Sequence, residues 1–254
     1  MNKLLIIDAL NLVRRIHAAL PDDNDTENLA RRVTSACQKL CKFHQPTHGL
    51  LVWDGEQVSW RKKLYPDYKK GRKPMPEALQ QSLPAIKQSL VDNLSLHSLN
   101  ADSEADDVIA TLATKMAKAG QQAIIVSTDK GFTQLMLANV QQWDHFSGQY
   151  FDITALENKL QIKQNQLLDF FALAGDSGNK IPGIAGIGTK TAAELLKSYH
   201  SLANIYAAID KLGEKQALKL AEGKEMARLC YKLAQLQTQI PLNINLSQYR
   251  LAPV

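Results

Sequence analysis

Residues 121–129 read QQAIIVSTD, in which the short apolar run AIIV is soon followed by a carboxylate, and this pattern recurs along the chain. KLLIID at 3–8 and HGLLVWDG at 48–55 have the same form, and NLSLHSL at 93–99 is a weaker copy. Continuously apolar strands that alternate with amphipathic helices are typical of a parallel sheet covered on both faces. The sequence therefore predicts an α/β fold, with a mostly parallel sheet flanked by helices.

Carboxylates gather where these predicted strands end. Asp8, Asp54 and Asp129 lie at or just past the ends of three of them, and ligands of open parallel sheets bind at that edge. The stretch SEADDVIATLA then opens a helix that we expect over 104–119. Its first residues add three more acids, Glu104, Asp106 and Asp107.

Two explanations compete for the acids of this helix. Ser103 with Asp106 resembles a capping box, and acids near a helix N-terminus are stabilised by the helix dipole by about 0.3–1 kcal/mol each. Mutual repulsion among the acids is of similar size, so capping alone does not account for them. Carboxylates without Lys or Arg in the same motifs suit Mg²⁺ or Mn²⁺, and a proton-sharing pair would need only two. We predict a divalent metal site.

Length and composition set the broad class. The 254 residues are enough for one large α/β domain or for a core with a helical annex. Lys and Arg outnumber Asp and Glu by 30 to 25, a mild excess that favours a polyanionic partner. Cys37 and Cys41 are four residues apart, with His44 nearby. They could form half of a metal site, but we prefer to interpret them as two buried thiols. Neither a signal peptide nor an 18-residue apolar run occurs, so we expect a cytoplasmic protein without membrane contact.

The segment RKKLYPDYKKGRK at 61–73 carries seven basic residues against one acid, with Tyr65 and Tyr68 between them. A solvated, mobile loop would also have this composition. Cations for phosphates and tyrosines for stacking on bases are, however, what a channel for a single strand requires. We therefore predict that this basic loop contacts nucleic acid.

From Tyr150 onward the pattern becomes mainly helical, so we divide the chain into 1–150 and 151–254. The turn GIAGIGTK is not a P-loop, because Thr189 stands where the lysine should be. Glycines before a helix leave N–H groups open to a phosphate, although a plain helix–turn–helix connection has the same composition. The tight bend before it exposes carbonyls of Leu173 and Ala174, which could replace the hydration shell of K⁺.

In order and spacing, five stretches resemble the 5′-nucleases, a family that includes flap endonucleases and the 5′-nuclease domain of bacterial DNA polymerase I. They are IIDALNL, VWDGEQVSWRKKLYPDYKKGRKPMPEAL, SEADDVIATLA, STDKGFTQLM and GDSGNKIPGIAGIGTKTAAELL, within residues 3 to 200. The resemblance implies a PIN-like α/β fold, a basic arch at about 56–92 and a helix–turn–helix DNA-binding element at about 165–196. It also implies a flap-DNA partner for a monomer that acts in DNA replication and repair.

The resemblance also implies roles for single residues. Asp106 and Glu104 would be the central Mg²⁺ ligands and catalytic groups, with Lys69 and Arg72 offsetting transition-state charge. One or two Mg²⁺ ions, replaceable by Mn²⁺, would be held directly or through water by Asp106, Glu104, Asp8, Asp54, Asp107 and Asp129. K⁺ would be held by the carbonyls of Leu173, Ala174, Pro182, Ile184 and Ile187. DNA would be contacted by Arg61, Lys69, Lys70, Arg72, Gly186, Ile187, Gly188, Thr189, Lys190 and Thr191.

Two departures from the family pattern affect the second metal group. Gly131 follows Asp129-Lys130 where the family has an acid, and Asn179 replaces an acid in GDSGNKIPG. Of that group only Asp129 and Asp176 remain. These departures favour an alternative, a K⁺-dependent flap-binding protein with weak or no nuclease activity. An RNA nuclease and a nucleotide-binding α/β protein are further alternatives, and DALNLVRR lacks the glycine fingerprint that the latter needs.

Overall fold

The structure is a computed structural model, and it describes residues 1–22 and 25–252. The chain divides into two compact units. Unit 1 contains residues 1–57, 73–151 and 236–254, and unit 2 contains 58–72 and 152–235. A change of unit after Phe151 lies close to the predicted boundary, but the units differ from the predicted domains. The segment 58–72 belongs with the helical unit, and the C-terminal tail belongs with the sheet.

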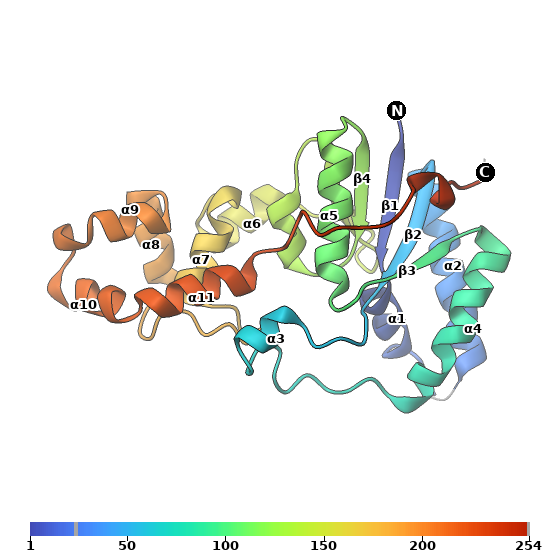
Figure 1. Cartoon of the computed structure of the whole chain (residues 1–254), viewed down its shortest axis with the longest axis horizontal. Coiled ribbons are helices and arrows are strands. Elements are labelled where there is room, and N and C mark those ends of the chain that lie inside the picture. The colour runs from blue at the N-terminus through green and yellow to red at the C-terminus, as the bar shows by residue number, and fades with distance from the viewer. Residues whose placement is uncertain (23–24, 253–254) are drawn as a thin grey trace. The chain divides into compact units, whose positions relative to one another are not determined.

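Unit 1 is built on one sheet with the strand order β3-β2-β1-β4-β5-β6, in which β1 to β5 pair in parallel and β6 pairs antiparallel with β5. Figure 1 labels the strands β1 to β4 of this sheet. The α/β fold class is thus confirmed. The strands are β1 (Lys3–Asp8), β2 (His48–Trp53), β3 (His97–Asn100), β4 (Gln122–Val126), β5 (Val140–Asp144) and β6 (Gln149–Tyr150). The helices are α1 (Ala9–His17), α2 (Thr26–His44), α4 (Glu77–Leu94) and α5 (Ala105–Lys118), with 3₁₀ turns η1 (Lys130–Leu135) and η4 (Leu246–Tyr249).

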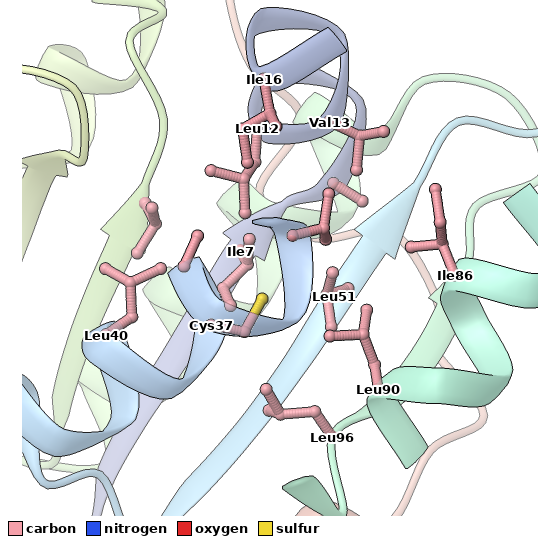
Figure 2. Close-up of a cluster of buried hydrophobic side chains, with 14 of the residues drawn as sticks. Ile7, Leu12, Val13, Ile16, Cys37, Leu40, Leu51, Ile86, Leu90 and Leu96 are labelled. Carbon is pink, nitrogen blue, oxygen red and sulfur yellow. The ribbon is translucent and has the colours of Figure 1, made fainter. Parts of the chain in front are cut away.

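The sheet is apolar on both faces because its strands are apolar without interruption. Leu5 and Ile7 of β1 face a core made with α1, α2 and α4, and Figure 2 shows side chains of these helices gathered over this face. Leu4 and Ile6 face the opposite core, which α5 and part of the C-terminal tail complete. This alternation follows from the period of two in a β-strand.

Two sequence predictions in unit 1 need correction. The strand expected at 93–99 begins only at His97, because α4 continues to Leu94. Ser95, with a φ of +54°, is the C-cap residue of that helix. The arch expected at 56–92 is shorter, because Glu77–Leu94 forms a helix with Leu79, Ile86 and Leu90 buried in the core.

Unit 2 is helical apart from short connections, which confirms the predicted helical C-terminal part. Its elements are α3 (Trp60–Leu64), α6 (Ile153–Leu160), η2 (Gln164–Gln166), α7 (Leu167–Ala174), α8 (Thr189–Tyr199), α9 (Leu202–Ala207), η3 (Ile209–Lys211), α10 (Glu214–Glu222) and α11 (Lys224–Ala234). Leu173, Leu196, Leu220 and Ala227 form part of its core. Among the described residues, no helix is long and apolar enough to cross a bilayer.

Candidate active site

The carboxyl ends of three neighbouring parallel strands carry the acids that the sequence singled out. Asp8 is the last residue of β1, Asp54 directly follows β2, and Asp129 follows β4. Strand β1 pairs in parallel with both β2 and β4, so these ends meet at one edge of the sheet. The structure therefore places all three acids along the edge where the sequence predicted a ligand site.

Asp8 is the most constrained of these carboxylates. It is 8% exposed, its Oδ1 accepts the N–H of Asn11 at 3.2 Å, and its Oδ2 accepts the Ser127 hydroxyl at 2.8 Å. Burial, followed by the negative charges of Asp106 and Asp54, raises the pKa of Asp8 to about 8, against the two hydrogen bonds, which lower it. Asp106 and Asp54 are thus each close enough to Asp8 to repel its negative charge.

The start of α5 is capped differently from the prediction. Glu104 is the N-cap residue, and the N–H of Ala105 is taken by Asp54 Oδ1 at 2.7 Å. Ser103 Oγ is buried and has no hydrogen-bond partner among the described residues, so the predicted capping box is wrong. An acid from the end of the neighbouring strand supplies the cap instead. This bond ties the acidic helix to the acidic end of β2.

Asp107 has a structural contact that the sequence did not predict. It is 5% exposed, and its Oδ1 accepts the N–H of Gln237 at 2.9 Å. Thr111, one turn further along α5, donates its hydroxyl to the Gln237 carbonyl at 3.2 Å. The pair holds the returning tail against α5. No local signal could identify Gln237, which lies 130 residues from Asp107.

Asp129 caps the 3₁₀ turn that follows it, with its Oδ1 accepting the Gly131 N–H at 2.7 Å. Asn11 holds the same loop from the first helix, since its amide donates to Thr128 Oγ1 at 3.0 Å and accepts the Thr128 N–H at 3.1 Å. Asn11 and Ser127 are therefore site residues that sequence reasoning missed. The polar Asn11 in an otherwise apolar helix start was the available signal.

Gln142 fixes this loop from the neighbouring strand β5. Its side-chain amide donates to the carbonyls of Ser127 at 2.8 Å and Asp129 at 2.7 Å. Gln142 is fully buried, which explains how a polar residue occupies a central strand. The backbone that carries Asp129 is thus held on two sides.

The acids suit a hard divalent ion in chemistry but are not arranged as a finished metal site. Among the described residues, no group of three or more His, Cys, Asp or Glu side chains has an arrangement that could hold a metal ion. Four of the carboxylates, those of Asp8, Asp54, Asp107 and Asp129, accept hydrogen bonds from N–H or hydroxyl groups. The donor set is nonetheless all oxygen, and a cation would offset the negative charges of Asp106 and Asp54, which add to burial in raising the pKa of Asp8. The six acids remain predicted ligands.

The basic segment lies in unit 2 except for Lys73, and its residues have different surroundings. Lys70 is exposed and forms an ion pair with Asp67 at 2.7 Å. Arg72 is exposed and donates from Nη2 to Asn179 Oδ1 at 2.8 Å. Lys69 is half-buried, has a φ of +54°, and donates its N–H to the Asn179 carbonyl at 2.9 Å.

Arg61 and Tyr68 require correction. Arg61 is 1% exposed, with Nε donating to the Leu233 carbonyl at 2.9 Å and Nη2 to the Gln235 carbonyl at 2.7 Å. Its guanidinium therefore supports the fold of unit 2, and the prediction that it contacts DNA is withdrawn. Tyr68 is 5% exposed and packs near Ile181, so its ring is not presented for base stacking.

The bend after α7 brings main chain against main chain. A Cβ added to Gly175 would lie 2.4 Å from the Ile181 oxygen, and one added to Gly183 would lie 2.8 Å from the Leu173 oxygen. The Leu173 carbonyl accepts the Ile184 N–H at 2.8 Å. Since a carbonyl has two lone pairs, this bond does not exclude a cation. This close approach of main chain requires glycine at both positions.

The start of α8 contains the remaining predicted DNA contacts. Gly188 is the N-cap residue, and no side chain among the described residues caps the first turn formed by Thr189, Lys190 and Thr191. Ile187 is buried, so only its main chain is available to a ligand. Gly186 has a φ of +75°, and its carbonyl accepts Lys219 Nζ at 3.2 Å. Lys219 was missed because it lies 33 residues away.

Comparison with known proteins agrees with this architecture. Residues 3–164 match the family model described as 5′-3′ exonuclease, N-terminal resolvase-like domain, and residues 162–254 match 5′-3′ exonuclease, C-terminal SAM fold. The chain is 64% identical over 253 residues to a protein named Flap endonuclease Xni from Shewanella amazonensis, with 100% of both chains covered.

Solved structures share the fold at low sequence identity. A T5 D15 flap endonuclease variant, solved as a pseudo-enzyme-product complex with DNA and metal ions, aligns with a TM-score of 0.76 and 21% identity, over 93% of this chain and 90% of that one. The catalytic core of Rad2 in complex with DNA substrate aligns with a TM-score of 0.60 and 13% identity, over 100% of this chain and 82% of that one.

The fold and the family models define the class, and the chain belongs to the 5′-3′ exonuclease family. Within that class it is a 5′-nuclease of the Xni type, as its full-length similarity to the curated relatives shows. The predicted family and the prediction that the chain is an enzyme are confirmed.

Proposed function

We propose that this chain is a structure-specific 5′-flap endonuclease that hydrolyses phosphodiester bonds of DNA near 5′-flap junctions with the help of Mg²⁺, in DNA replication and repair. The observation that carries the proposal is the convergence of Asp8, Asp54, Asp129 and the start of α5 on one edge of the sheet. Burial, followed by the negative charges of Asp106 and Asp54, raises the pKa of Asp8 there. The name of the 64%-identical relative supports the flap substrate.

The acids divide into predicted ligands and residues that orient them. Asp106 and Glu104 are the proposed central ligands, with Asp8, Asp54, Asp107 and Asp129 binding directly or through water. When bound, one or two Mg²⁺ or Mn²⁺ ions would activate water and stabilise the charge of the in-line transition state. Asn11 and Ser127 hold the Asp8 carboxylate in place, and Asp54 fixes the start of the helix that carries Asp106.

Unit 2 supplies the proposed DNA contacts. Lys69, Lys70 and Arg72 offer positive charge to phosphates, with Lys69 and Arg72 offsetting charge in the transition state. The uncapped first turn of α8, from Gly188 to Thr191, would receive a phosphate on its N–H groups, together with Gly186 and the main chain of Ile187. This turn is part of the proposed helix–turn–helix element at about 165–196.

K⁺ is the proposed second cofactor, held by the carbonyls of Leu173, Ala174, Pro182, Ile184 and Ile187. The close approach of main chain at Gly175 and Gly183 supports this site. We expect the protein to act as a monomer in the cytoplasm on branched DNA.

A K⁺-dependent flap-binding protein with little nuclease activity is the second candidate. Gly131 offers only its N–H to Asp129, and the Asn179 amide is engaged with Asp176 at 2.7 Å and with Arg72. At both positions where the second metal group lacks an acid, a neutral residue forms hydrogen bonds and supplies no negative charge.

The test is a substrate comparison with purified protein, Mg²⁺ and K⁺. We expect a labelled DNA 5′-flap to be cut at the junction, while an RNA flap of the same sequence and a blunt duplex remain uncut. Binding of the flap without any product would favour the second candidate, and preferential cleavage of the RNA flap would overturn the DNA assignment.

A further inference from the structure

The turn that carries Asn179 is closed by its own hydrogen bonds. Asp176 and Ile181 exchange main-chain bonds of 2.8 and 2.9 Å, which makes an isolated antiparallel bridge. Within the turn, the Asp176 carboxylate accepts the Gly178 N–H at 3.0 Å and the Asn179 side-chain amide at 2.7 Å. Asn179 is therefore held in one orientation from inside the turn.

From this position Asn179 receives two donors of the basic segment. Its carbonyl accepts the Lys69 N–H at 2.9 Å, and its Oδ1 accepts Arg72 Nη2 at 2.8 Å. The two donors are three residues apart and more than 100 residues from Asn179 in sequence. One side chain thus connects Asp176 to Arg72, while the main chain of the same residue holds Lys69.

The basic segment has a backbone that needs such support. Lys69 and Gly71 have φ values of +54° and +79°, and the left-handed region is unfavourable for a lysine. The segment's own turns are closed by the bonds from the Tyr68 N–H to the Tyr65 carbonyl and from the Lys70 N–H to the Asp67 carbonyl, of 2.9 and 3.0 Å. Burial of Tyr68 anchors its centre, and Asn179 holds the part that follows.

An amide is the side chain that this position requires. It offers a donor to Asp176 and an acceptor to Arg72 at the same time. An aspartate would keep the acceptor but would bring a second carboxylate against Asp176, and an alanine would lose both bonds. Asn179, which replaces an acid of the second metal group, thus also connects the turn to the basic segment.

We propose that Asn179 is a positioning residue that fixes Lys69 and Arg72 in a single conformation before DNA binds. This inference rests on the proposed function for its catalytic consequence, because Lys69 and Arg72 are the cations assigned to the reacting phosphate. Its structural consequence, an ordered basic segment in the DNA-free protein, is independent of that function.

The first experiment is limited trypsin digestion of the full-length, DNA-free protein, with peptides identified by mass spectrometry. In Asn179→Ala we expect cleavage after Lys69, Lys70 and Arg72 to accelerate about tenfold, the factor that corresponds to one or two lost hydrogen bonds. Ser177→Ala, an exposed position on the same turn, is the matched control and should be cut like the wild type. Equal rates in Asn179→Ala and the wild type would overturn the proposal.

The second experiment is a double-mutant cycle on flap cleavage under single-turnover conditions. Asn179→Ala should lower the cleavage rate more than the affinity, and it should have little further effect in an Arg72→Ala background. Additive losses would show that Asn179 does not act through Arg72. A wild type that does not cut flaps would refute the proposed function, while the trypsin comparison would still decide whether Asn179 orders the segment.

Discussion

We predict that the substitution Arg61→Met destabilises the protein. The sequence placed Arg61 among the DNA-binding residues because six further basic residues follow it within 62–73. In the structure its guanidinium is buried and donates to the carbonyls of Leu233 and Gln235. It also lies over the ring of Trp60, 4.5 Å from the ring centroid.

The magnitude follows from the bonds that would be lost. A hydrogen bond from a charged group contributes about 1.5–3 kcal/mol, so two of them contribute about 3–6 kcal/mol before any offset. Methionine would fill much of the volume, and removal of a buried charge returns part of its desolvation cost. The two carbonyls, however, would lose these donors. We expect a net loss of about 2–4 kcal/mol in the free energy of unfolding, a large part of a typical 5–15 kcal/mol.

The assay is urea unfolding of Arg61→Met beside Lys62→Met, which changes an exposed neighbour on α3 and should unfold like the wild type. Flap affinity is then measured over a range of salt concentrations, under conditions where both variants are folded. We expect the salt dependence of Arg61→Met to match that of the wild type, because Arg61 contacts no phosphate. Unchanged stability together with a weaker salt dependence would refute the structural role and restore the DNA contact.

Three further predictions concern stability and cation binding. Burial, followed by the charge of Lys3, lowers the pKa of His44 to about 4, so between pH 6.5 and 4 the unfolded chain takes up a proton that the folded protein does not. The free energy of unfolding should therefore fall as the pH drops from 6.5 towards 4, and an equally steep fall in His44→Phe would contradict this cause. Asp107→Ala should lower the midpoint of thermal unfolding, because it removes the acceptor for the Gln237 N–H at a cost of about 1–2 kcal/mol. Asp107→Asn should keep that acceptor, and equal losses in both variants would show that the charge of Asp107 matters instead. Gly183→Ala should abolish the effect of K⁺ on flap affinity, because residue 183 has a φ of +71° and a Cβ there would lie 2.5 Å from the Gly175 nitrogen. A retained K⁺ effect would argue against the carbonyl site.

Local pattern was sufficient for much of the fold. The strands at 3–8, 48–53 and 122–126 were predictable because each is apolar without a break, and their parallel pairing places Asp8, Asp54 and Asp129 at one edge. Strand β5 was missed because VQQWD lacks that pattern, and its Gln142 is buried only because it bonds the loop carbonyls of Ser127 and Asp129.

Long-range contacts account for what the sequence could not predict. Composition describes Arg61 as one of seven basic residues, whereas its environment is set by carbonyls more than 170 residues away. Asp107 and Gln237 are related only through the path of the tail. The replacement of an acid by Asn179 was visible as a departure from a family pattern, but its bonds to Lys69 and Arg72 depend on the fold of unit 2.

The most direct test of the central claim is Mg²⁺-dependent cleavage of a labelled 5′-flap duplex by the wild type and by Asp106→Ala, purified in parallel. Asp106 lies in the first turn of α5 and is close enough to Asp8 to contribute, after burial, to its raised pKa. We predict cleavage at the junction by the wild type, with a loss of at least about a hundredfold in the variant, as for removal of a principal charge-stabilising group. Equal product from both proteins, or none from either, would contradict the assignment of hydrolysis to this acidic edge.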